Sequence, residues 1–277
     1  MNASTIRIAC VQTDPRLGQV EINLVRLCAW VERAAQAKAK LVVFPECALS
    51  GYVFESLEEA RPHAEEIPGP ATARIVRCCL DHKIHVVWGM LERAGNQLHN
   101  ACVLAGPEGI LSVYRKVHLP AMGVDRFTTA GTNEFTVCEA AGIRLGLHIC
   151  YDGAFPEPPR ALALSGAELL VLPTNWATGA EPLAEHLMAC RALENVVYAM
   201  AVDRVGDEAG TRFIGGSGIY DPFGRTLAKA GDREEEMLVT EIDPARARDK
   251  LIVRQPGRAW CDRFADRRPE HYRTLVP

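Results

Sequence analysis

Three residues that could do chemistry together follow short apolar segments of this chain: a glutamate, a lysine and a cysteine. Glu46 comes after the apolar run Leu41–Phe44, Lys116 lies in a Tyr-Arg-Lys-Val-His segment, and Cys150 ends the run Gly146–Ile149. In α/β sheets, ligands bind outside the carboxyl ends of strands, where loops carry functional side chains. The three side chains could therefore converge on one pocket.

The three residue types fit nucleophilic catalysis. A cysteine thiol needs a nearby cation or base before it can attack at neutral pH. Glu46 can take the thiol proton of Cys150, and Lys116 supplies the cation. Attack on an electrophilic carbon would build an oxyanion, which Lys116 and the backbone N–H of Tyr151 could stabilise. Spacing alone does not show that these residues meet.

The chain contains ten cysteines, and most of them lie in apolar segments, where a free cysteine behaves as a small buried hydrophobe. No Cys-x-x-Cys pair and no paired His/Cys spacing indicates a structural zinc site. We therefore expect no metal, and the proposed chemistry requires no cofactor. Without a secretory signal, a framework of disulfides is not expected either.

Composition and charge narrow the class of protein. The chain has 277 residues, 48% hydrophobic and 24% charged, which is typical of a globular protein with a substantial core. A net charge of −4 gives no basic footprint for nucleic acid or an anionic membrane, so we expect neither partner. No apolar run approaches the roughly 20 residues of a membrane span. The N-terminus does not resemble a signal peptide, so we expect a cytoplasmic protein.

The pattern of apolar residues predicts strands that alternate with helices, which implies an α/β layered fold with mixed sheets. We read residues 1–277 as one domain, since no linker or charge block divides them. The predicted strands are Thr5–Val11, Leu41–Phe44, Ile84–Met90, Thr136–Cys138, Ile143–Ile149, Glu168–Leu172, Val196–Val202 and Met237–Ile242. The predicted hairpins are Gln97–Leu104 with Ile110–Tyr114, and Ser217–Tyr220 with Arg225–Ala228. The predicted helices are Glu21–Lys38, Ala71–His82, Pro156–Ser165 and Glu181–Glu194, and the tail from Asp243 is expected to be helical and then irregular.

Three segments resemble the motifs of the nitrilase (carbon–nitrogen hydrolase) superfamily, in order and with similar gaps. They are Phe44-Pro45-Glu46, Tyr114-Arg115-Lys116-Val117-His118-Leu119-Pro120 and Ile149-Cys150-Tyr151-Asp152. The likeness runs from Ile6 to about Ile242. It implies a four-layer αββα sandwich with two mixed β-sheets, assembled as a homodimer or higher homo-oligomer, with the tail from about residue 243 in oligomer contacts. It also implies that Glu46, Lys116 and Cys150 form the family's catalytic triad.

The residues after the nucleophile point to a substrate class. Cys-Tyr-Asp resembles amidases and carbamoylases, whereas nitrilases proper more often carry Cys-Trp-Glu. The resemblance therefore implies hydrolysis of a small amide through a cysteine thioester, releasing ammonia or an amine and a carboxylic acid. Alternatives are an N-carbamoyl amino acid amidohydrolase, a true nitrilase or an acyltransferase on the same triad, and a catalytically silent binding protein.

Four residues are expected to contact substrate. Tyr52 follows the glutamate motif, and Asn175 and Trp176 lie in a segment that resembles the pocket loop of amidases, although Trp176 could equally be core packing. Many family members carry a second glutamate before a glycine that corresponds to Gly131, and this chain has none there. Asp125 is the nearest acid, and either replaces that glutamate or forms a structural salt bridge with Arg126. A further alternative makes His148, two residues before the cysteine, the general base.

Overall fold

The computed structural model describes residues 5–275, so the first four and last two residues of the expected domain lie outside it. Its first sheet has six strands in the order β14-β1-β2-β3-β4-β5. Strands β1, β2 and β3 are parallel, and β14, β4 and β5 join them by antiparallel pairing. The strands are β1 (Ile6–Gln12), β2 (Leu41–Val43), β3 (His85–Ala94), β4 (Gln97–Gly106), β5 (Gly109–Arg115) and β14 (Glu236–Ile242).

The second sheet repeats this plan, with six strands in the order β13-β12-β9-β8-β7-β6. Strands β7, β8 and β9 are parallel, and antiparallel strands flank them on both sides. The strands are β6 (Val137–Ala140), β7 (Ile143–Leu147), β8 (Leu169–Pro173), β9 (Tyr198–Val202), β12 (Gly218–Tyr220) and β13 (Thr226–Lys229). Both sheets are therefore mixed, as the sequence predicts.

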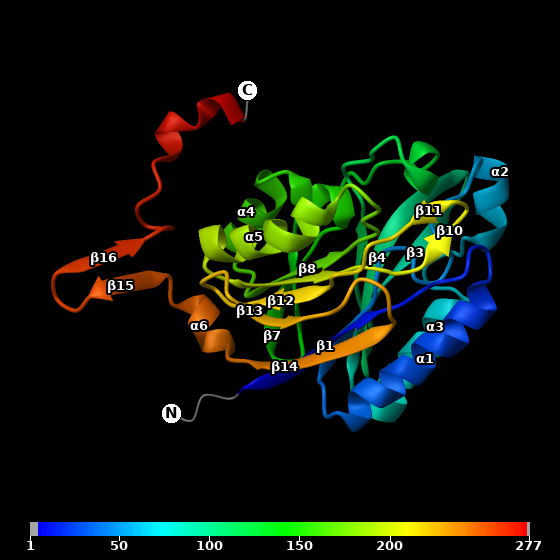
Figure 1. Ribbon diagram of the computed structural model, residues 1–277, viewed down its shortest axis with the longest axis horizontal. Helices are drawn as coiled ribbons and strands as arrows, with labels where there is room; N and C mark the ends of the chain where they lie inside the picture. Colours follow the sequence, from blue (N-terminus) through cyan, green and yellow to red (C-terminus); the bar gives the residue numbers. More distant parts are fainter. Residues whose placement is uncertain (1–4, 276–277) are drawn as a thin grey trace.

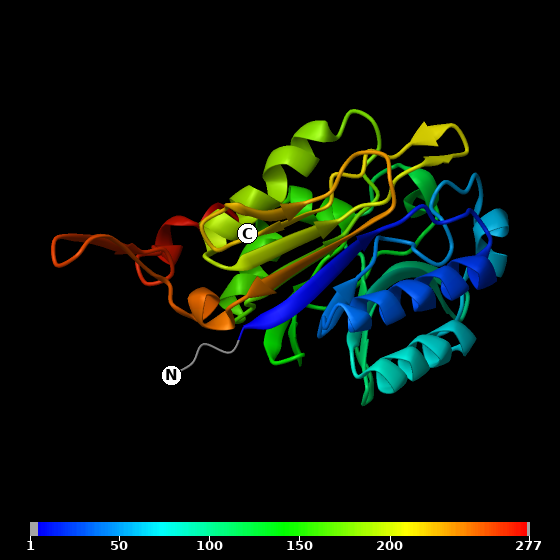
Figure 2. The ribbon, with the colours of Figure 1, turned by 60° about the horizontal axis from the view of Figure 1, so that its bottom comes forward.

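Two helices cover the outer face of each sheet (Figures 1 and 2). The first sheet carries α1 (Val20–Gln36) and α3 (Pro70–His82), and the second carries α4 (Glu157–Leu164) and α5 (Met188–Asn195). In α1 the buried side chains recur every three or four residues, which turns one stripe of the helix toward the sheet. The layers are helix, sheet, sheet and helix, which confirms the predicted αββα sandwich.

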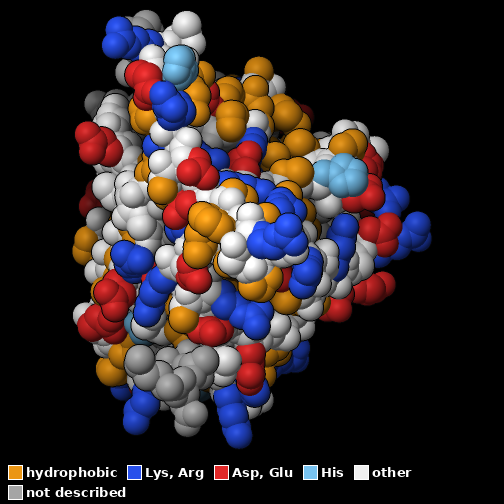
Figure 3. Space-filling view, turned by 90° about the vertical axis from the view of Figure 1, so that its left-hand side faces the viewer, with side chains coloured by type: hydrophobic (Ala, Val, Ile, Leu, Met, Phe, Trp, Pro, Cys, Tyr) orange, Lys and Arg blue, Asp and Glu red, His pale blue; other side chains and the backbone are white. Residues whose placement is uncertain are grey.

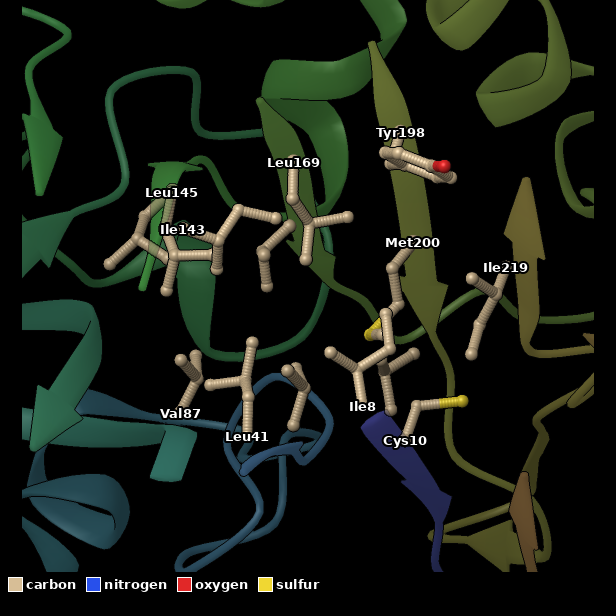
Figure 4. Packing of buried hydrophobic residues seen from close by; sticks show 14 of the residues in the cluster. Ile8, Cys10, Leu41, Val87, Ile143, Leu145, Leu169, Tyr198, Met200 and Ile219 are labelled. Atoms are coloured by element: carbon tan, nitrogen blue, oxygen red, sulfur yellow. The ribbon is translucent and has the colours of Figure 1, made fainter. Parts of the chain in front are cut away.

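The two sheets enclose the central core (Figure 4). Alternation along each strand separates this core from the helix-facing layers, because successive side chains point to opposite faces. In β1, Ile8 and Cys10 face the second sheet, while Ala9 and Val11 pack under the helices. In β8, Leu169 faces the core and Leu170 packs toward α4 and α5.

Several boundaries differ from the sequence prediction. The strand predicted to reach Ile149 ends at Leu147, because the chain turns into a 3₁₀ segment at Cys150–Ala154. The helix predicted over Glu181–Glu194 is a π-helical turn followed by α5. The remaining short elements are α2 (Leu57–Ala60), β10 (Asp207–Glu208), β11 (Thr211–Arg212), a π-helical turn at Leu183–Leu187 and 3₁₀ turns at Arg61–His63, Gly123–Arg126, Pro269–His271 and Arg273–Leu275.

The C-terminal segment leaves the sandwich after β14. It begins with α6 (Pro244–Arg248), and then forms a hairpin of β15 (Leu251–Gln255) and β16 (Ala259–Asp262), where the sequence prediction of irregular structure is wrong. The hairpin projects away from both sheets (Figures 1 and 2), and hydrophobic side chains are exposed among charged ones at this end of the molecule (Figure 3). Among residues 5–275, no helix has the length and apolar character to cross a membrane.

Candidate active site

The carboxyl ends of the parallel strands of both sheets meet at one end of the sandwich. A parallel bridge between Thr13 and Arg204, just beyond β1 and β9, joins the two sheets there. β5 runs in the same direction as β2, because two antiparallel steps from β3 restore the direction. The chain therefore brings the segments after β2, β5 and β7 to the same edge.

Glu46 lies in the turn after β2, and its side chain is fully buried. Gly89 of β3 makes room for this turn: a Cβ there would lie 2.4 Å from the Cys47 nitrogen and 2.6 Å from the Glu46 Cα. The Gly89 nitrogen also donates to the Pro45 carbonyl at 3.1 Å. The backbone of β3 thus sets the position from which the carboxylate enters the site.

Lys116 follows β5 and is fully buried beside two carboxylates. Its Nζ donates to Glu46 Oε1 at 2.7 Å and to Asp125 Oδ2 at 2.5 Å. Its backbone nitrogen donates to the Asn100 carbonyl at 2.8 Å, which continues the strand pairing by one residue. A buried ammonium held by two carboxylates is the electrostatic centre of the site.

Asn100 of β4 joins the same two carboxylates, and the sequence reasoning missed it. Its Nδ2 donates to Glu46 Oε1 at 2.7 Å and to Asp125 Oδ1 at 2.9 Å. The available signal was a polar side chain next to the apolar run of a strand, since buried polar residues need partners. Asn100 holds Glu46 and Asp125 together across Lys116.

Asp125 lies in the 3₁₀ turn Gly123–Arg126 and also accepts from the Tyr52 hydroxyl at 2.9 Å. The Arg126 guanidinium instead donates to the Phe54 carbonyl at 3.0 Å, so the alternative of an Asp125–Arg126 salt bridge is wrong. Tyr52 is only 4% exposed, and its hydroxyl is occupied by Asp125. Tyr52 is therefore arranged to hold a carboxylate of the site.

Cys150 begins the 3₁₀ segment directly after β7 and has a positive φ of 44°. This left-handed conformation is unfavourable for a residue with a side chain and is often found where a functional group must be presented. The cysteine is partly exposed, whereas Glu46 and Lys116 are fully buried. The Tyr151 N–H lies in the first turn of the 3₁₀ segment, where backbone donors have no partner within the helix.

Asp152 ties the lysine segment to the cysteine segment. Its carboxylate accepts from the Tyr114 hydroxyl at 2.7 Å, from His118 Nδ1 at 2.7 Å and from the Ile149 nitrogen at 3.0 Å. Burial would raise the pKa of Asp152, but the hydrogen bonds from His118 and Ile149 outweigh it and lower that pKa. The aspartate of Cys-Tyr-Asp is thus a cross-link between two motifs.

The charges of the site shift the pKa of each of its reactive groups. Burial, followed by the Glu46 charge, raises the pKa of the Cys150 thiol, while the Lys116 charge lowers it. Burial raises the pKa of Glu46, Lys116 opposes this and Asp125 adds to it. Burial would lower the pKa of Lys116, but Glu46, Cys150 and Asp125 hold it well above its usual value. The resting site therefore favours a protonated lysine and a thiol whose proton needs a base.

Asn175 and Trp176 follow β8, and the structure gives them different surroundings. The Asn175 side chain is 4% exposed, and neither its Nδ2 nor its Oδ1 has a hydrogen-bond partner among the described residues. Trp176 packs in the core under α5, and its backbone nitrogen donates to Asp203 at 2.9 Å. Asn175 therefore has a free amide for a ligand, and Trp176 mainly packs.

Two other groups compete for the chemical roles. His148 is fully buried, and burial lowers its pKa to about 4. Neither ring nitrogen of His148 has a partner within the described part of the chain, and β7 ends before Cys150, so the two side chains do not follow one strand. Cys47 lies beside Glu46 but is fully buried, and its thiol donates to Asn100 Oδ1 at 3.7 Å. Of these two cysteines, only Cys150 is partly exposed.

Comparison with known proteins places these features in context. A family model described as carbon–nitrogen hydrolase matches residues 7–250. A nitrilase of Pyrococcus abyssi is 37% identical over 268 residues, 96% of this chain and 99% of the relative. An (R)-stereoselective amidase of a Pseudomonas species is 36% identical and covers 86% of this chain and 85% of its own. The solved structure of a double mutant of an amidase from Nesterenkonia sp., in complex with acrylamide, superposes with a TM-score of 0.82 at 27% identity, covering 100% of this chain and 99% of that one.

Proposed function

The chain belongs to the carbon–nitrogen hydrolase family and is an amidase-type enzyme, and on that premise we propose that it cleaves a small linear amide through a thioester on Cys150. The observation that carries the proposal is the buried Lys116 ammonium, which donates to Glu46 at 2.7 Å, together with Cys150, a partly exposed thiol whose pKa both charges shift. This arrangement supplies a base, a cation and a nucleophile in one place.

The first half of the proposed reaction acylates the enzyme. Glu46 takes the proton of the Cys150 thiol, and its raised pKa makes it a stronger base than a free carboxylate. The sulfur bonds to the amide carbon, and the C=O electron pair becomes an oxyanion near Lys116 and the Tyr151 N–H. The C–N bond then breaks as Glu46 returns its proton to the nitrogen, which leaves as ammonia or an amine.

The second half of the proposed reaction regenerates the thiol. Glu46 accepts a proton from water, the oxygen bonds to the thioester carbon, and the C–S bond breaks. The proton returns to the sulfur and a carboxylic acid is released. In one neighbouring structure, a mutant of the Nesterenkonia amidase carries the acetamide moiety of fluoroacetamide on its active-site cysteine. That adduct supports the assignment of Cys150 as nucleophile.

We propose that the amide group of the substrate binds to the side-chain amide of Asn175. A substrate carbonyl can accept from its Nδ2, and a substrate N–H can donate to its Oδ1, which would satisfy two polar atoms that lack partners in the described chain. Trp176 contributes by packing beneath this segment. Asp125 holds Lys116, and Tyr52 holds Asp125, so we place both behind the substrate rather than against it.

Release of ammonia from a panel of aliphatic amides, ω-amides of dicarboxylates and N-carbamoyl amino acids tests the proposal. Cys150→Ala is expected to abolish turnover and keep the thermal unfolding midpoint, and Cys190→Ala, at an exposed cysteine, is the matched control. Iodoacetamide should label Cys150 faster than the other nine thiols. Ammonia release by Cys150→Ala at the wild-type rate would disprove the thioester.

A nitrilase is the second candidate, because the Pyrococcus abyssi relative carries that name. A nitrile would bond to the same sulfur and form a thioimidate in place of the tetrahedral amide adduct. Aliphatic nitriles, assayed beside the matching amides, separate the two activities, and adding an amine acceptor reveals any acyl transfer. We expect amides to be the better substrates, since Cys150 is followed by Tyr-Asp.

We also propose that the protein is a cytoplasmic homodimer or larger homo-oligomer, with the C-terminal segment from about residue 243 in the contacts. The β15–β16 hairpin pairs with no other strand of the described chain and exposes apolar side chains, with Trp260 62% and Val253 53% exposed. Multi-angle light scattering should give a multiple of 30.4 kDa for the full chain and a smaller mass for Trp260→Glu. An unchanged mass would exclude the hairpin from the interface.

A further inference from the structure

Glu208 connects the segment after β9 to the active-site loop of the first sheet. It lies in β10, and the short β10–β11 hairpin reaches across to the segment that follows β2 (Figure 1). Its Oε1 accepts hydrogen bonds from the backbone nitrogens of Tyr52 at 2.7 Å and Val53 at 2.6 Å. One buried carboxylate oxygen therefore satisfies two consecutive amides of a loop that is 156 residues away in the sequence.

Arg204 fixes the other end of this carboxylate. Its Nη1 donates to Glu208 Oε2 at 2.5 Å, and its Nη2 donates to the Pro15 carbonyl at 2.9 Å and to Asp14 Oδ1 at 3.0 Å. Arg204 is 1% exposed and Glu208 is 5% exposed, so little solvent screens the pair. The guanidinium also stacks over the Phe213 ring at 4.3 Å. The carboxylate is therefore held rigidly.

The Tyr52 side chain carries this constraint into the site. The Tyr52 ring packs directly against the Gly123 backbone, and only a glycine leaves room for it: a Cβ at Gly123 would lie 2.3 Å from the ring carbon Cε1. The Tyr52 hydroxyl donates to Asp125 Oδ2 at 2.9 Å, and the same oxygen accepts from Lys116 Nζ at 2.5 Å. A shift of the Tyr52 backbone would therefore move the hydroxyl away from Asp125 and change how Asp125 holds Lys116.

We propose that Glu208 is a positioning residue for amide hydrolysis, which fixes the Tyr52 backbone so that the Tyr52 hydroxyl holds Asp125 against Lys116. This inference rests on the proposed function. Glu208 makes no hydrogen bond to Cys150 or Lys116; it holds the Tyr52–Val53 backbone, and of these two residues Tyr52 binds a carboxylate of the site. Because the proposed effect depends on the Tyr52 hydroxyl, replacing Glu208 should have little effect on activity in a variant that lacks this hydroxyl.

A double-mutant cycle tests this prediction, because coupled residues give non-additive effects and independent residues give multiplicative ones. Glu208→Ala should lower kcat/KM about 30-fold in the wild-type background, mainly through kcat, and about 3-fold or less in the Tyr52→Phe background. Glu208→Gln retains an oxygen for the two amides and should recover most of the loss. Equal fold-losses in the two backgrounds would overturn the proposal, and so would a Gln variant as impaired as the Ala variant.

Glu168→Ala is the matched control for a general loss of stability. Glu168 is also a buried glutamate that accepts from a backbone nitrogen, that of Arg144 at 2.9 Å, and pairs with arginines, but it lies at the opposite end of β8. The Glu168→Ala variant should have a lower unfolding midpoint than the wild type, and its kcat/KM should stay within about 3-fold of the wild-type value. If Glu208→Ala does not fold, Glu208→Asp replaces it in the cycle, because its shorter side chain cannot span both amides and Arg204.

The outcomes for Glu208 and for the proposed function are separate. An inactive wild type, or an active Cys150→Ala variant, would contradict the function itself. A wild type that needs Cys150, combined with multiplicative effects of Glu208 and Tyr52, would contradict only the positioning role.

Discussion

Lys116 donates its shorter hydrogen bond to Asp125, at 2.5 Å, and the longer one, at 2.7 Å, to Glu46. The ammonium is thus shared between two carboxylates in a site from which solvent is excluded. One positive charge does not neutralise two negative ones. Asp125 consequently helps to raise the pKa of Glu46, after burial and against the effect of Lys116. Asp125 therefore favours the protonated form of Glu46 and also holds the Lys116 ammonium in place.

Asp125→Asn should move the acid limb of the pH profile of kcat/KM to lower pH. Removing the Asp125 charge removes one cause of the raised pKa of Glu46, so the base form of Glu46 persists to a lower pH. The measurement is ammonia release between pH 4 and 9. Glu185→Gln, at a side chain that is 65% exposed, is the control. An acid limb that stays in place or rises would contradict the electrostatic role of Asp125.

Asp152→Asn should destabilise the fold, because the new amide group would face donors that now bind a carboxylate. We expect a loss of about 2–4 kcal/mol in the free energy of unfolding at pH 7, measured by urea titration. The lowered pKa of Asp152 means that its contribution is present above about pH 4 and is lost as the pH falls further. The difference between wild type and variant should therefore shrink in acid. A difference that does not depend on pH would count against this account.

His148 should make the fold sensitive to mild acid without taking part in the chemistry. Burial lowers its pKa to about 4, whereas the unfolded chain titrates near 6.5. As the pH falls from about 6.5 to 4, the unfolded state binds a proton that the folded state does not, which costs roughly 3 kcal/mol of stability. His148→Gln should flatten this dependence in urea titrations. It should keep kcat/KM within about tenfold of wild type; complete loss of activity in a folded variant would favour a Cys–His dyad.

Gly89→Ala should damage both stability and activity, because the added Cβ would meet the backbone of the Glu46 turn at 2.4 and 2.6 Å. Backbone atoms cannot move aside as a flexible side chain can, so we expect a loss of more than about 2 kcal/mol in unfolding free energy and at least about a tenfold lower kcat. Gly231→Ala, where a Cβ would meet nothing within 4 Å, is the matched control. Equal behaviour of the two variants would show that the turn can relax.

Local patterns in the sequence determined the elements and their order. A short run of apolar residues indicates a strand buried on both faces, as in residues 8–11, where Ile8 and Cys10 face one layer and Ala9 and Val11 face the other. This pattern can be recognised from neighbouring residues alone. The three motifs likewise predicted that Glu46, Lys116 and Cys150 share a site, because each follows the end of a strand. These inferences need only neighbouring residues and the rule that parallel strands end at one edge of a sheet.

Only the tertiary structure decided which distant polar groups meet. No local pattern indicates that Asp125 binds Lys116 rather than Arg126, that Asn100 bridges two carboxylates, or that Glu208 caps Tyr52 from another sheet. Hydrogen bonds form over about 3 Å, so a partner is selected by the packing of whole layers and not by its own sequence context. The backbone of Cys150, held at a positive φ, is decided in the same way. The sequence thus predicted which groups react, and the packing of the two sheets determined how those side chains are held.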